Sequence, residues 1–213
     1  MISIIISSIN PSLLKQLSDN IDKTIGVEYE IITHNNYETN WGICKVYNHC
    51  AKKAKYDYSV FCHEDILFHT QNWGKKLVEL LKNKEIALVG VAGSTFKSKH
   101  PAPWISVPKK FYRTNAMSNI NDKQKKHINN PDNNEKYSQV VILDGYFLST
   151  TKENWKKNKF DENKITGFHY YDIDYSLKQQ KKVVVTHKIL IEHFSKGNFD
   201  KNWLKTSIQY HKK

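Results

Sequence analysis

A cluster of ionisable side chains follows a short apolar run late in the first third of the chain. Residues 58–62 read Tyr-Ser-Val-Phe-Cys, which is typical of a buried strand, and His63, Glu64 and Asp65 follow directly. Carboxylates at the end of a buried strand are costly unless a charged group meets them. A Mg²⁺ or Mn²⁺ ion held by one or two carboxylates completes its shell with phosphate oxygens. The cluster therefore indicates a nucleotide-dependent enzyme, with an ordinary acidic turn as the alternative.

The composition predicts one globular domain over residues 1–213. The chain has 213 residues, 39% of them hydrophobic, with twelve Tyr, nine Phe and five Trp, which is enough for a sizeable core. Cys44, Cys50 and Cys62 lack the spacing of a zinc site or a disulfide framework and favour a reducing compartment. No apolar run reaches membrane-spanning length, and the N-terminal run does not resemble a signal peptide. We therefore expect a cytoplasmic protein.

The formal net charge of +12 does not by itself predict nucleic-acid binding. Arg113 is the only arginine, although arginine is the residue best suited to reading bases and gripping phosphates. Residues 97–136 carry nine basic and three acidic residues. We expect a flexible basic loop around residues 97–138 that could contact anionic phospholipid at a membrane surface or a polyanionic acceptor. A solvated loop without a partner is the simpler alternative, and no nucleic-acid partner is expected.

The elements that must position the ionisable cluster alternate between strands and helices through the first half of the chain. Strand-like runs at residues 2–8, 27–33, 58–62 and 86–91 are separated by segments with helical spacing. Asn10 and Pro11 predict the start of the first helix, and Asn72 is expected to cap the third. This βαβαβαβ order predicts an α/β fold with a mainly parallel central sheet and flanking helices.

The second half of the chain is less regular. Residues 95–138 contain four prolines, many Asn and Lys and little periodicity, so we expect a long loop or lid there. Residues 139–149 are strand-like, with Asp144 and Gly145 inside the strand. A short helix capped by Thr151 follows, another helical stretch starts near Asp172, and residues 183–191 predict a final strand leading to His193.

Polar residues follow most of these strands. In open α/β sheets, ligands bind outside the carboxyl ends of the strands, so we expect these residues to converge on one crevice. They are Ser7, Ser8, Asn35, Asn36, His63, Glu64, Asp65, Gly93, Ser94, Asp144 and His193.

The order of these motifs resembles that of GT-A fold glycosyltransferases of the family 2-like group. The first strand with Ser7 and Ser8 resembles the family's opening nucleotide-binding strand. The second ends at Asn35 and Asn36, where the family has an Asp or Asn that contacts the base, and the next helix, with Asn48, is similar to a family helix containing Asn and Ala. Residues 63–65 stand at the family's Asp-x-Asp motif, and residues 171–174, Tyr-Asp-Ile-Asp, resemble its Glu-Asp-x-Asp base motif. The likeness covers nearly the whole chain.

The resemblance implies an inverting, metal-dependent transfer of a sugar from a nucleoside-diphosphate sugar to a hydroxyl of a glycan, of a lipid-linked acceptor or of another acceptor. Asp172 would be the base, and Asp65 with His193 would hold Mn²⁺ or Mg²⁺. The acceptor would contact Trp104 and the strand bearing Asp144 and Gly145. The residues that would bind the donor are Ser7, Ser8, Asn35, Asn36, Asn48, His63 and Glu64.

Two positions depart from the family motifs. His63 replaces the first Asp of Asp-x-Asp, as in a subgroup associated with streptomycin biosynthesis, and Tyr171 replaces the Glu before Asp172. A catalytically weak nucleotide-sugar-binding protein is therefore an alternative. A nucleotidyltransferase-like enzyme is a second, disfavoured because no Gly-rich basic loop follows the first strand, and a basic nucleic-acid-binding module is a third.

Overall fold

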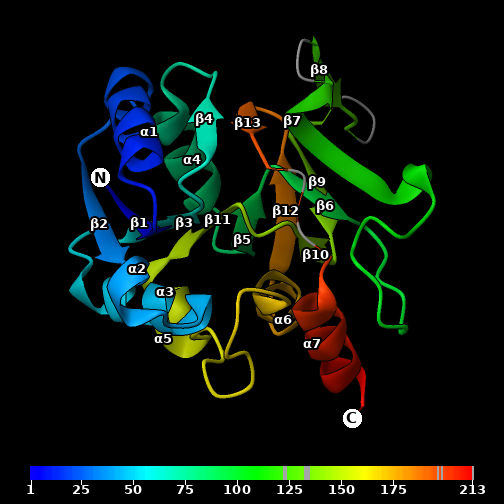
Figure 1. Cartoon of the computed structure of the whole chain (residues 1–213). Coiled ribbons are helices and arrows are strands. Elements are labelled where there is room, and N and C mark those ends of the chain that lie inside the picture. Colours follow the sequence, from blue (N-terminus) through cyan, green and yellow to red (C-terminus); the bar gives the residue numbers. More distant parts are fainter. Residues whose placement is uncertain (122–123, 132–134, 196, 198, 213) are drawn as a thin grey trace.

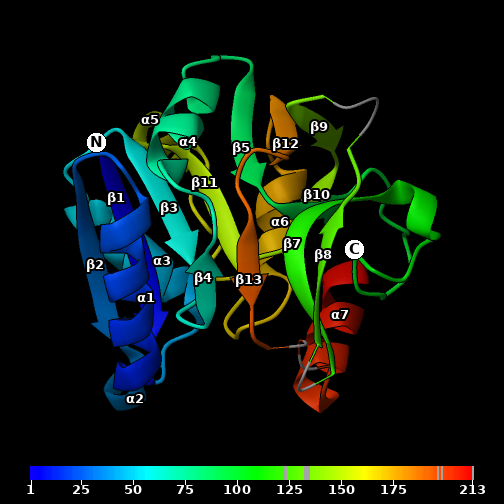
Figure 2. The same ribbon diagram turned by 90° about the horizontal axis from the view of Figure 1, so that it is seen from above.

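The computed structural model describes residues 1–121, 124–131, 135–195, 197 and 199–212. It contains two β-sheets, with helices on both faces of the larger one (Figures 1 and 2). Among the described residues, no helix combines the length and the apolar character needed to cross a bilayer.

The larger sheet has seven strands in the order β2-β1-β3-β11-β5-β12-β9. β1 pairs in parallel with β2 and β3, and β12 pairs in parallel with β5, whereas β11 and β9 run antiparallel to their neighbours. Most strands of this sheet therefore share one direction, which confirms the predicted α/β fold with its mainly parallel central sheet. The strands are β1 Ile2–Ser8, β2 Tyr29–Asn35, β3 Tyr58–Cys62, β5 Ile86–Gly90, β9 Tyr137–Val140, β11 Phe147–Thr151 and β12 Lys182–Thr186.

This sheet separates two hydrophobic cores. Within β1, Ile2, Ile4 and Ile6 belong to one core and Ile5 to the other, so the strand is apolar on both faces, as expected for a strand buried between helices. Helices α1 Pro11–Thr24 and α4 Trp73–Leu81 cover the first face. Helices α3 Ile43–Lys53, α5 Lys152–Lys157 and α6 Tyr171–Leu177 cover the second (Figure 2).

The smaller sheet joins segments that are distant in sequence. Its strands lie in the order β10-β6-β7-β13-β4, and β8 pairs with β7. β4 begins one residue after Asp65 and pairs antiparallel with β13, which places His193 opposite Ile66. This pairing brings Asp65 and His193 together. The strands are β4 Ile66–Phe68, β6 Ala92–Ser94, β7 Tyr112–Asn121, β8 Gln124–Asn129, β10 Ile142–Leu143 and β13 Ile191–His193.

Three short elements complete the fold. They are α2 Asn36–Thr39, the 3₁₀ turn η1 Lys109–Phe111 and the C-terminal helix α7 Lys201–His211. Asp200 caps α7 by accepting a hydrogen bond from the Trp203 amide at 2.8 Å. Asn10 and Thr151 cap α1 and α5 as predicted, whereas the Asn72 side chain makes no capping hydrogen bond to α4.

The expectation of an irregular loop is wrong for residues 112–121 and 124–129, which form the β7–β8 pair. The sequence gives no alternation there because the described β8 side chains from Lys125 to Asn129 are all exposed. The proline-rich part of the expected loop, residues 95–111, does connect β6 to β7 largely without regular structure and contains the short η1 turn.

Two predicted strands are in fact divided. Residues 139–149 contribute to β9, β10 and β11, and Asp144 and Gly145 lie in the link between β10 and β11 rather than inside a strand. Residues 183–191 were predicted as one strand, but β12 ends at Thr186 and β13 begins at Ile191, in the other sheet. In both segments polar residues stand at the division, Asp144 in the first and His187 with Lys188 in the second.

Candidate functional site

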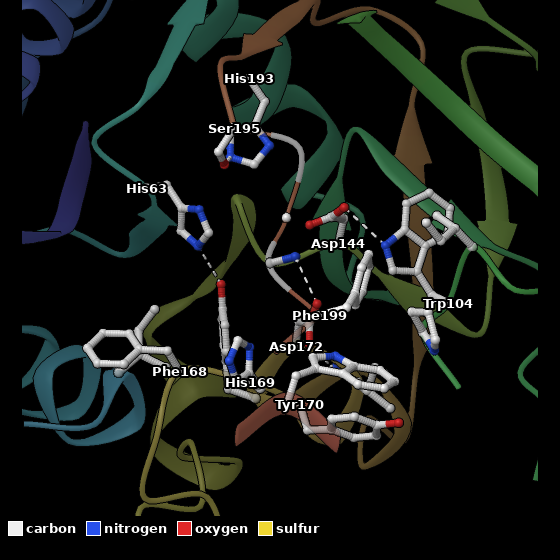
Figure 3. Close-up of a pocket in the computed structure, with 18 residues that line it drawn as sticks. His63, Trp104, Asp144, Phe168, His169, Tyr170, Asp172, His193, Ser195 and Phe199 are labelled. Atoms are coloured by element: carbon white, nitrogen blue, oxygen red, sulfur yellow. Dashed lines mark hydrogen bonds between the residues drawn. The ribbon is translucent and has the colours of Figure 1, made fainter. Parts of the chain in front are cut away.

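One pocket of about 410 Å³ opens where the ends of both sheets meet the start of α6 (Figure 3). His63 follows β3, Asp144 and Gly145 follow β10, and His193 ends β13. The remaining walls come from the start of α6, from three loops and from α7. Their residues are Pro103, Trp104, Ile105, Phe168, His169, Tyr170, Tyr171, Asp172, Ile173, Ser195, Gly197, Phe199 and Trp203, together with Ile43 of α3.

His63 and His193 line one side of this pocket, and together with Asp65, which does not itself line it, they form a cluster that could hold a metal ion. One ligand atom from each residue lies within 4.8 Å of the others. Asp65 Oδ1 is 3.3 Å from His193 Nε2 and 3.8 Å from His63 Nδ1. The backbone fixes these positions, because the Phe194 amide donates to the Asp65 carbonyl at 3.0 Å.

The electrostatics of the cluster suit a cation. Burial opposes ionisation of Asp65, but the hydrogen bond from His193 and the positive charges that His193 and His63 carry when protonated hold the pKa of this carboxyl below its usual range. Burial, followed by the proximity of His193, lowers the pKa of His63 to about 4, so this imidazole is neutral at pH 7. Metal ligation needs an ionised carboxylate and neutral imidazoles. Two imidazole nitrogens and one carboxylate therefore fit a divalent transition ion such as Mn²⁺ better than Mg²⁺, which prefers oxygen ligands.

Asp172 faces the pocket from the opposite side (Figure 3). Its Oδ1 accepts a hydrogen bond from the Ile173 amide at 2.8 Å, and its Oδ2 accepts one from the Gly145 amide at 3.1 Å. Burial and the nearby Asp144 charge raise the pKa of Asp172 to about 7, against the lowering effect of those amides. The carboxylate is therefore held in place and titrates near neutral pH.

Asp144 lies between His193 and Trp104 on the pocket wall (Figure 3). Its Oδ2 accepts a hydrogen bond from Trp104 Nε1 at 3.0 Å, and burial raises the pKa of this carboxyl. Asp144 and Trp104, both predicted as acceptor residues, are thus in direct contact on the pocket wall.

The turn that starts α6 is tightly constrained. Tyr170 has a φ of 69°, in the left-handed region that a bulky side chain rarely adopts. Its hydroxyl bonds Ser207 Oγ at 2.6 Å and the Ala102 carbonyl at 3.3 Å, which ties both α7 and the 101–105 loop to the base of α6. A Cβ on Gly145 would lie 2.1 Å from Tyr171 Oη, so this position requires glycine.

Several residues predicted to bind the donor lie outside the pocket and are bonded elsewhere in the protein. The buried Glu64 carboxylate accepts hydrogen bonds from Ser8 Oγ at 2.6 Å and from the Ile9 and Asn10 amides at 3.1 Å, and so closes the turn between β1 and α1. Ser7 lies at the end of β1, opposite His34 of β2, and does not line the pocket.

Asn48, Asn35 and Asn36 are likewise engaged away from the pocket. The Asn48 side chain donates to the Phe160 carbonyl at 2.8 Å and accepts from Trp155 Nε1 at 3.2 Å. Asn35 caps α2, and the buried Asn36 holds the Trp41 backbone. The expected convergence on one crevice is therefore met only in part. Of the predicted donor residues, His63 alone lines the pocket, and the donor role of the others stays a prediction.

Apart from Trp104, the sequence pattern did not single out the residues of the aromatic walls. Phe168, His169 and Tyr170 come from a run of aromatic residues immediately before Asp172, and that run was the signal available. Phe199 and Trp203 reach the pocket only because α7 packs against Tyr170, a tertiary contact without a local sequence signature.

Comparison with solved structures shows which fold this is. The chain superposes on a crystal structure of GalNAc-T7 with UDP, GalNAc and Mn²⁺ with a TM-score of 0.61, at 10% identity, over 92% of this chain and 44% of that one. The mannosyltransferase PcManGT from Pyrobaculum calidifontis, in complex with GDP-Man and Mn²⁺, gives a TM-score of 0.58 at 12% identity, over 90% of this chain and 56% of that one. S. aureus TarS 1-349 gives 0.56 at 11% identity, over 90% of this chain and 60% of that one.

These identities are low enough to show the fold alone, and this chain spans less than two thirds of each of those three proteins. No curated protein matches the sequence. The model of the Glycosyltransferase like family, however, matches residues 3–212. Together with the GT-A architecture, this match shows that the chain belongs to the Glycosyltransferase like family, of the family 2-like type.

Proposed function

We propose that the protein transfers a sugar from a nucleoside-diphosphate sugar to a hydroxyl acceptor, with inversion at the anomeric carbon. The observation that carries this proposal is the placement of His63, Asp65 and His193 on one side of a pocket and of Asp172 on the other. In-line displacement needs a positive centre at the leaving group and a base on the opposite side, so this separation is the arrangement the reaction requires.

The donor side of the reaction would be at the cluster of His63, Asp65 and His193. A Mn²⁺ ion held there would supply the positive charge that stabilises the departing diphosphate. GalNAc-T7, which shares the fold, was crystallised with UDP and Mn²⁺, and PcManGT with GDP-Man and Mn²⁺, which supports the same pairing of nucleotide and metal here.

Asp172 is the proposed base. The Gly145 and Ile173 amides fix its carboxylate, and a pKa of about 7 lets it accept a proton near neutral pH. The proton of the acceptor hydroxyl would pass to Asp172 as the hydroxyl oxygen bonds the anomeric carbon. Asp174 is less suited to this role, because it is buried and ion-paired with Lys164 at 2.8 Å.

The acceptor side would be formed by Asp144, Trp104, Phe199 and Trp203. Aromatic faces pack well against the apolar faces of sugar rings, and a fixed carboxylate such as Asp144 accepts hydrogen bonds from hydroxyl groups. This lining supports a glycan or a lipid-linked sugar as the acceptor.

The mouth of the pocket suggests contact with a membrane surface through the first part of the basic segment expected from sequence and through α7. Ile105, Phe168 and Phe199 line the pocket and are between 42% and 52% exposed. Phe96, in the loop that bears Ile105, and Leu204 and Ile208, on α7, are between 39% and 50% exposed. Lys97 Nζ lies 3.2 Å from His211 Nε2, so the 95–105 loop and α7 are neighbours. The apolar rim, as we call this set, consists of Phe96, Ile105, Phe168, Phe199, Leu204 and Ile208.

Basic residues accompany the apolar rim. Residues 95–113 contain five basic residues and no acidic one, and α7 adds the exposed Lys201 and Lys205. Apolar side chains between lysines are typical of surfaces that bind anionic bilayers. We therefore propose that the apolar rim rests on anionic phospholipid and turns the pocket toward acceptors at that surface.

The donor assignment is tested by thermal unfolding with UDP, GDP and dTDP, each with and without Mn²⁺. We expect at least one nucleotide to raise the unfolding temperature, and to raise it further with Mn²⁺, because a ligand at about 100 times its Kd stabilises the folded state by about 2.7 kcal/mol. No shift with any combination at millimolar concentrations would contradict the donor site.

A second prediction separates the metal ligand from its structural neighbour. Asp65→Asn should lose the Mn²⁺-dependent part of nucleotide binding and keep the fold, whereas Glu64→Gln should keep Mn²⁺ binding. Because Glu64 accepts bonds from two amides and a hydroxyl, Glu64→Gln should lower the free energy of unfolding by about 1–3 kcal/mol. Electron paramagnetic resonance of free Mn²⁺ and urea unfolding measure the two effects. Unchanged Mn²⁺ affinity in Asp65→Asn would remove Asp65 from the site.

A third prediction concerns the base. Asp172→Asn should retain donor and Mn²⁺ affinity and lose about 10²- to 10⁴-fold in kcat. Asp174→Asn is the matched control from the same helix and should keep most of the rate. In the wild type, kcat/KM should fall as pH drops below about 7, the pKa of Asp172, because the protonated carboxyl cannot accept a proton. NMR of the product should show an inverted anomeric centre. A retained configuration, or an Asp172→Asn enzyme as fast as wild type, would refute this assignment.

Stability provides an independent check on Asp172. Its pKa is raised from 3.8 to about 7 in the folded state, so ionisation destabilises the fold progressively as pH rises between those values. Asp172→Asn cannot ionise and should therefore unfold at a higher temperature than wild type at pH 8, with a smaller difference at pH 4. Equal unfolding temperatures at both pH values would show that the carboxyl is not perturbed.

The membrane proposal predicts co-sedimentation with vesicles that contain phosphatidylglycerol and weak binding to pure phosphatidylcholine. The double variant Leu204→Glu/Ile208→Glu should reduce binding to the anionic vesicles by more than about tenfold, because it removes apolar contact and adds negative charge. Ile9→Glu, an exposed apolar position on the β1–α1 turn, is the control and should bind like wild type. Equal binding by the double variant would contradict the role of the apolar rim.

A further inference from the structure

The two positions at which this chain departs from the family motifs are in contact with each other. His63 Nε2 and Tyr171 Oη lie 2.7 Å apart, although the residues are 108 positions apart in sequence (Figure 3). Both residues line the pocket. The contact shows that the two departures act on one site rather than on separate parts of it.

The surrounding residues leave Tyr171 little freedom. Its side chain is buried, and its ring packs edge-on against Tyr47 at a centroid distance of 5.9 Å. Gly145 leaves the space that Tyr171 Oη occupies, since a Cβ there would lie 2.1 Å from it. The hydroxyl is thus held at a fixed point beside His63.

This contact has a consequence for the tautomer of His63. A neutral imidazole carries one N–H group and one lone pair. If Nε2–H donates to Tyr171 Oη, the lone pair resides on Nδ1. Nδ1 is the atom that faces Asp65, at 3.8 Å from Oδ1, and it belongs to the cluster that could hold a metal.

We propose that Tyr171 is a positioning residue that orients His63 and leaves its Nδ1 lone pair available, so that His63 serves as a third metal ligand beside Asp65 and His193. Hydrogen bonds from the second nitrogen of a ligating imidazole fix its orientation and tautomer in metal sites generally. A tyrosine hydroxyl can orient the imidazole without adding the negative charge that the family's Glu at this position would bring. Asp65 therefore remains the single carboxylate of the cluster. Nitrogen ligands then dominate the site and select Mn²⁺ over Mg²⁺.

This inference rests on the proposed metal site, but its test does not require sugar transfer. The test compares Tyr171→Phe with Tyr175→Phe, a buried tyrosine of the same helix that does not line the pocket. Mn²⁺ affinity is measured by electron paramagnetic resonance without nucleotide. Tyr171→Phe should weaken binding by about 10- to 100-fold, and Tyr175→Phe should leave it unchanged.

A double-mutant cycle shows whether the effect passes through His63. In a His63→Ala background, Tyr171→Phe should cause no further loss of Mn²⁺ affinity. The ¹⁵N chemical shifts of His63 in the metal-free wild type should show a protonated Nε2 and an unprotonated Nδ1, and this pattern should be lost in Tyr171→Phe.

Three results would overturn the inference. They are an unchanged Mn²⁺ affinity in Tyr171→Phe, an equal loss with and without His63, and a protonated Nδ1 in the wild type. If the wild-type protein transfers no sugar but the double-mutant cycle still shows coupling between Tyr171 and His63 in Mn²⁺ binding, the proposed function alone is refuted.

Discussion

The pairing of β13 with β4 is the constraint on which the site depends. His193 lies opposite Ile66, and the Phe194 amide bonds the Asp65 carbonyl, so the register alone brings Asp65 and His193 within 3.3 Å. A slip of one residue would turn His193 to the other face of the sheet. Glu192 opposes such a slip, because its buried carboxylate is hydrogen-bonded to His69 at 3.0 Å and ion-paired with Lys125 at 2.7 Å on that other face.

On the opposite side of the pocket, two features around the proposed base lower the stability of the fold. The left-handed backbone at Tyr170 and the raised pKa of Asp172 both destabilise the fold, and packing around them must compensate. Tyr170 is itself part of that compensation, since its hydroxyl bonds both α7 and the loop at Ala102. Tyr170 thus connects the strained turn before Asp172 to the loop and the helix that bear the aromatic walls of the pocket.

Much of this arrangement could be predicted from sequence, because strands such as residues 2–8 and 58–62 have strong apolar patterns and their polar ends carry Asp65 and His63. Long-range pairing could not be predicted. The strand β13 has only three residues, too few for a recognisable pattern, and the β7–β8 pair exposes its β8 side chains and so lacks alternation. The role of Glu64 could not be predicted either. Sequence alone does not distinguish a glutamate that binds a ligand from one, such as Glu64, that accepts hydrogen bonds within a turn.

The central claim is that a metal ion and the donor's diphosphate occupy the corner formed by His63, Asp65 and His193, across the pocket from Asp172. Anomalous diffraction from crystals grown with UDP and Mn²⁺ tests it most directly. The account predicts one Mn²⁺ peak coordinated by His63 Nδ1, an Asp65 oxygen and His193 Nε2, with diphosphate oxygens completing the shell. Ordered UDP with Mn²⁺ bound elsewhere on the protein, or with these three side chains directed away from the metal, would contradict it.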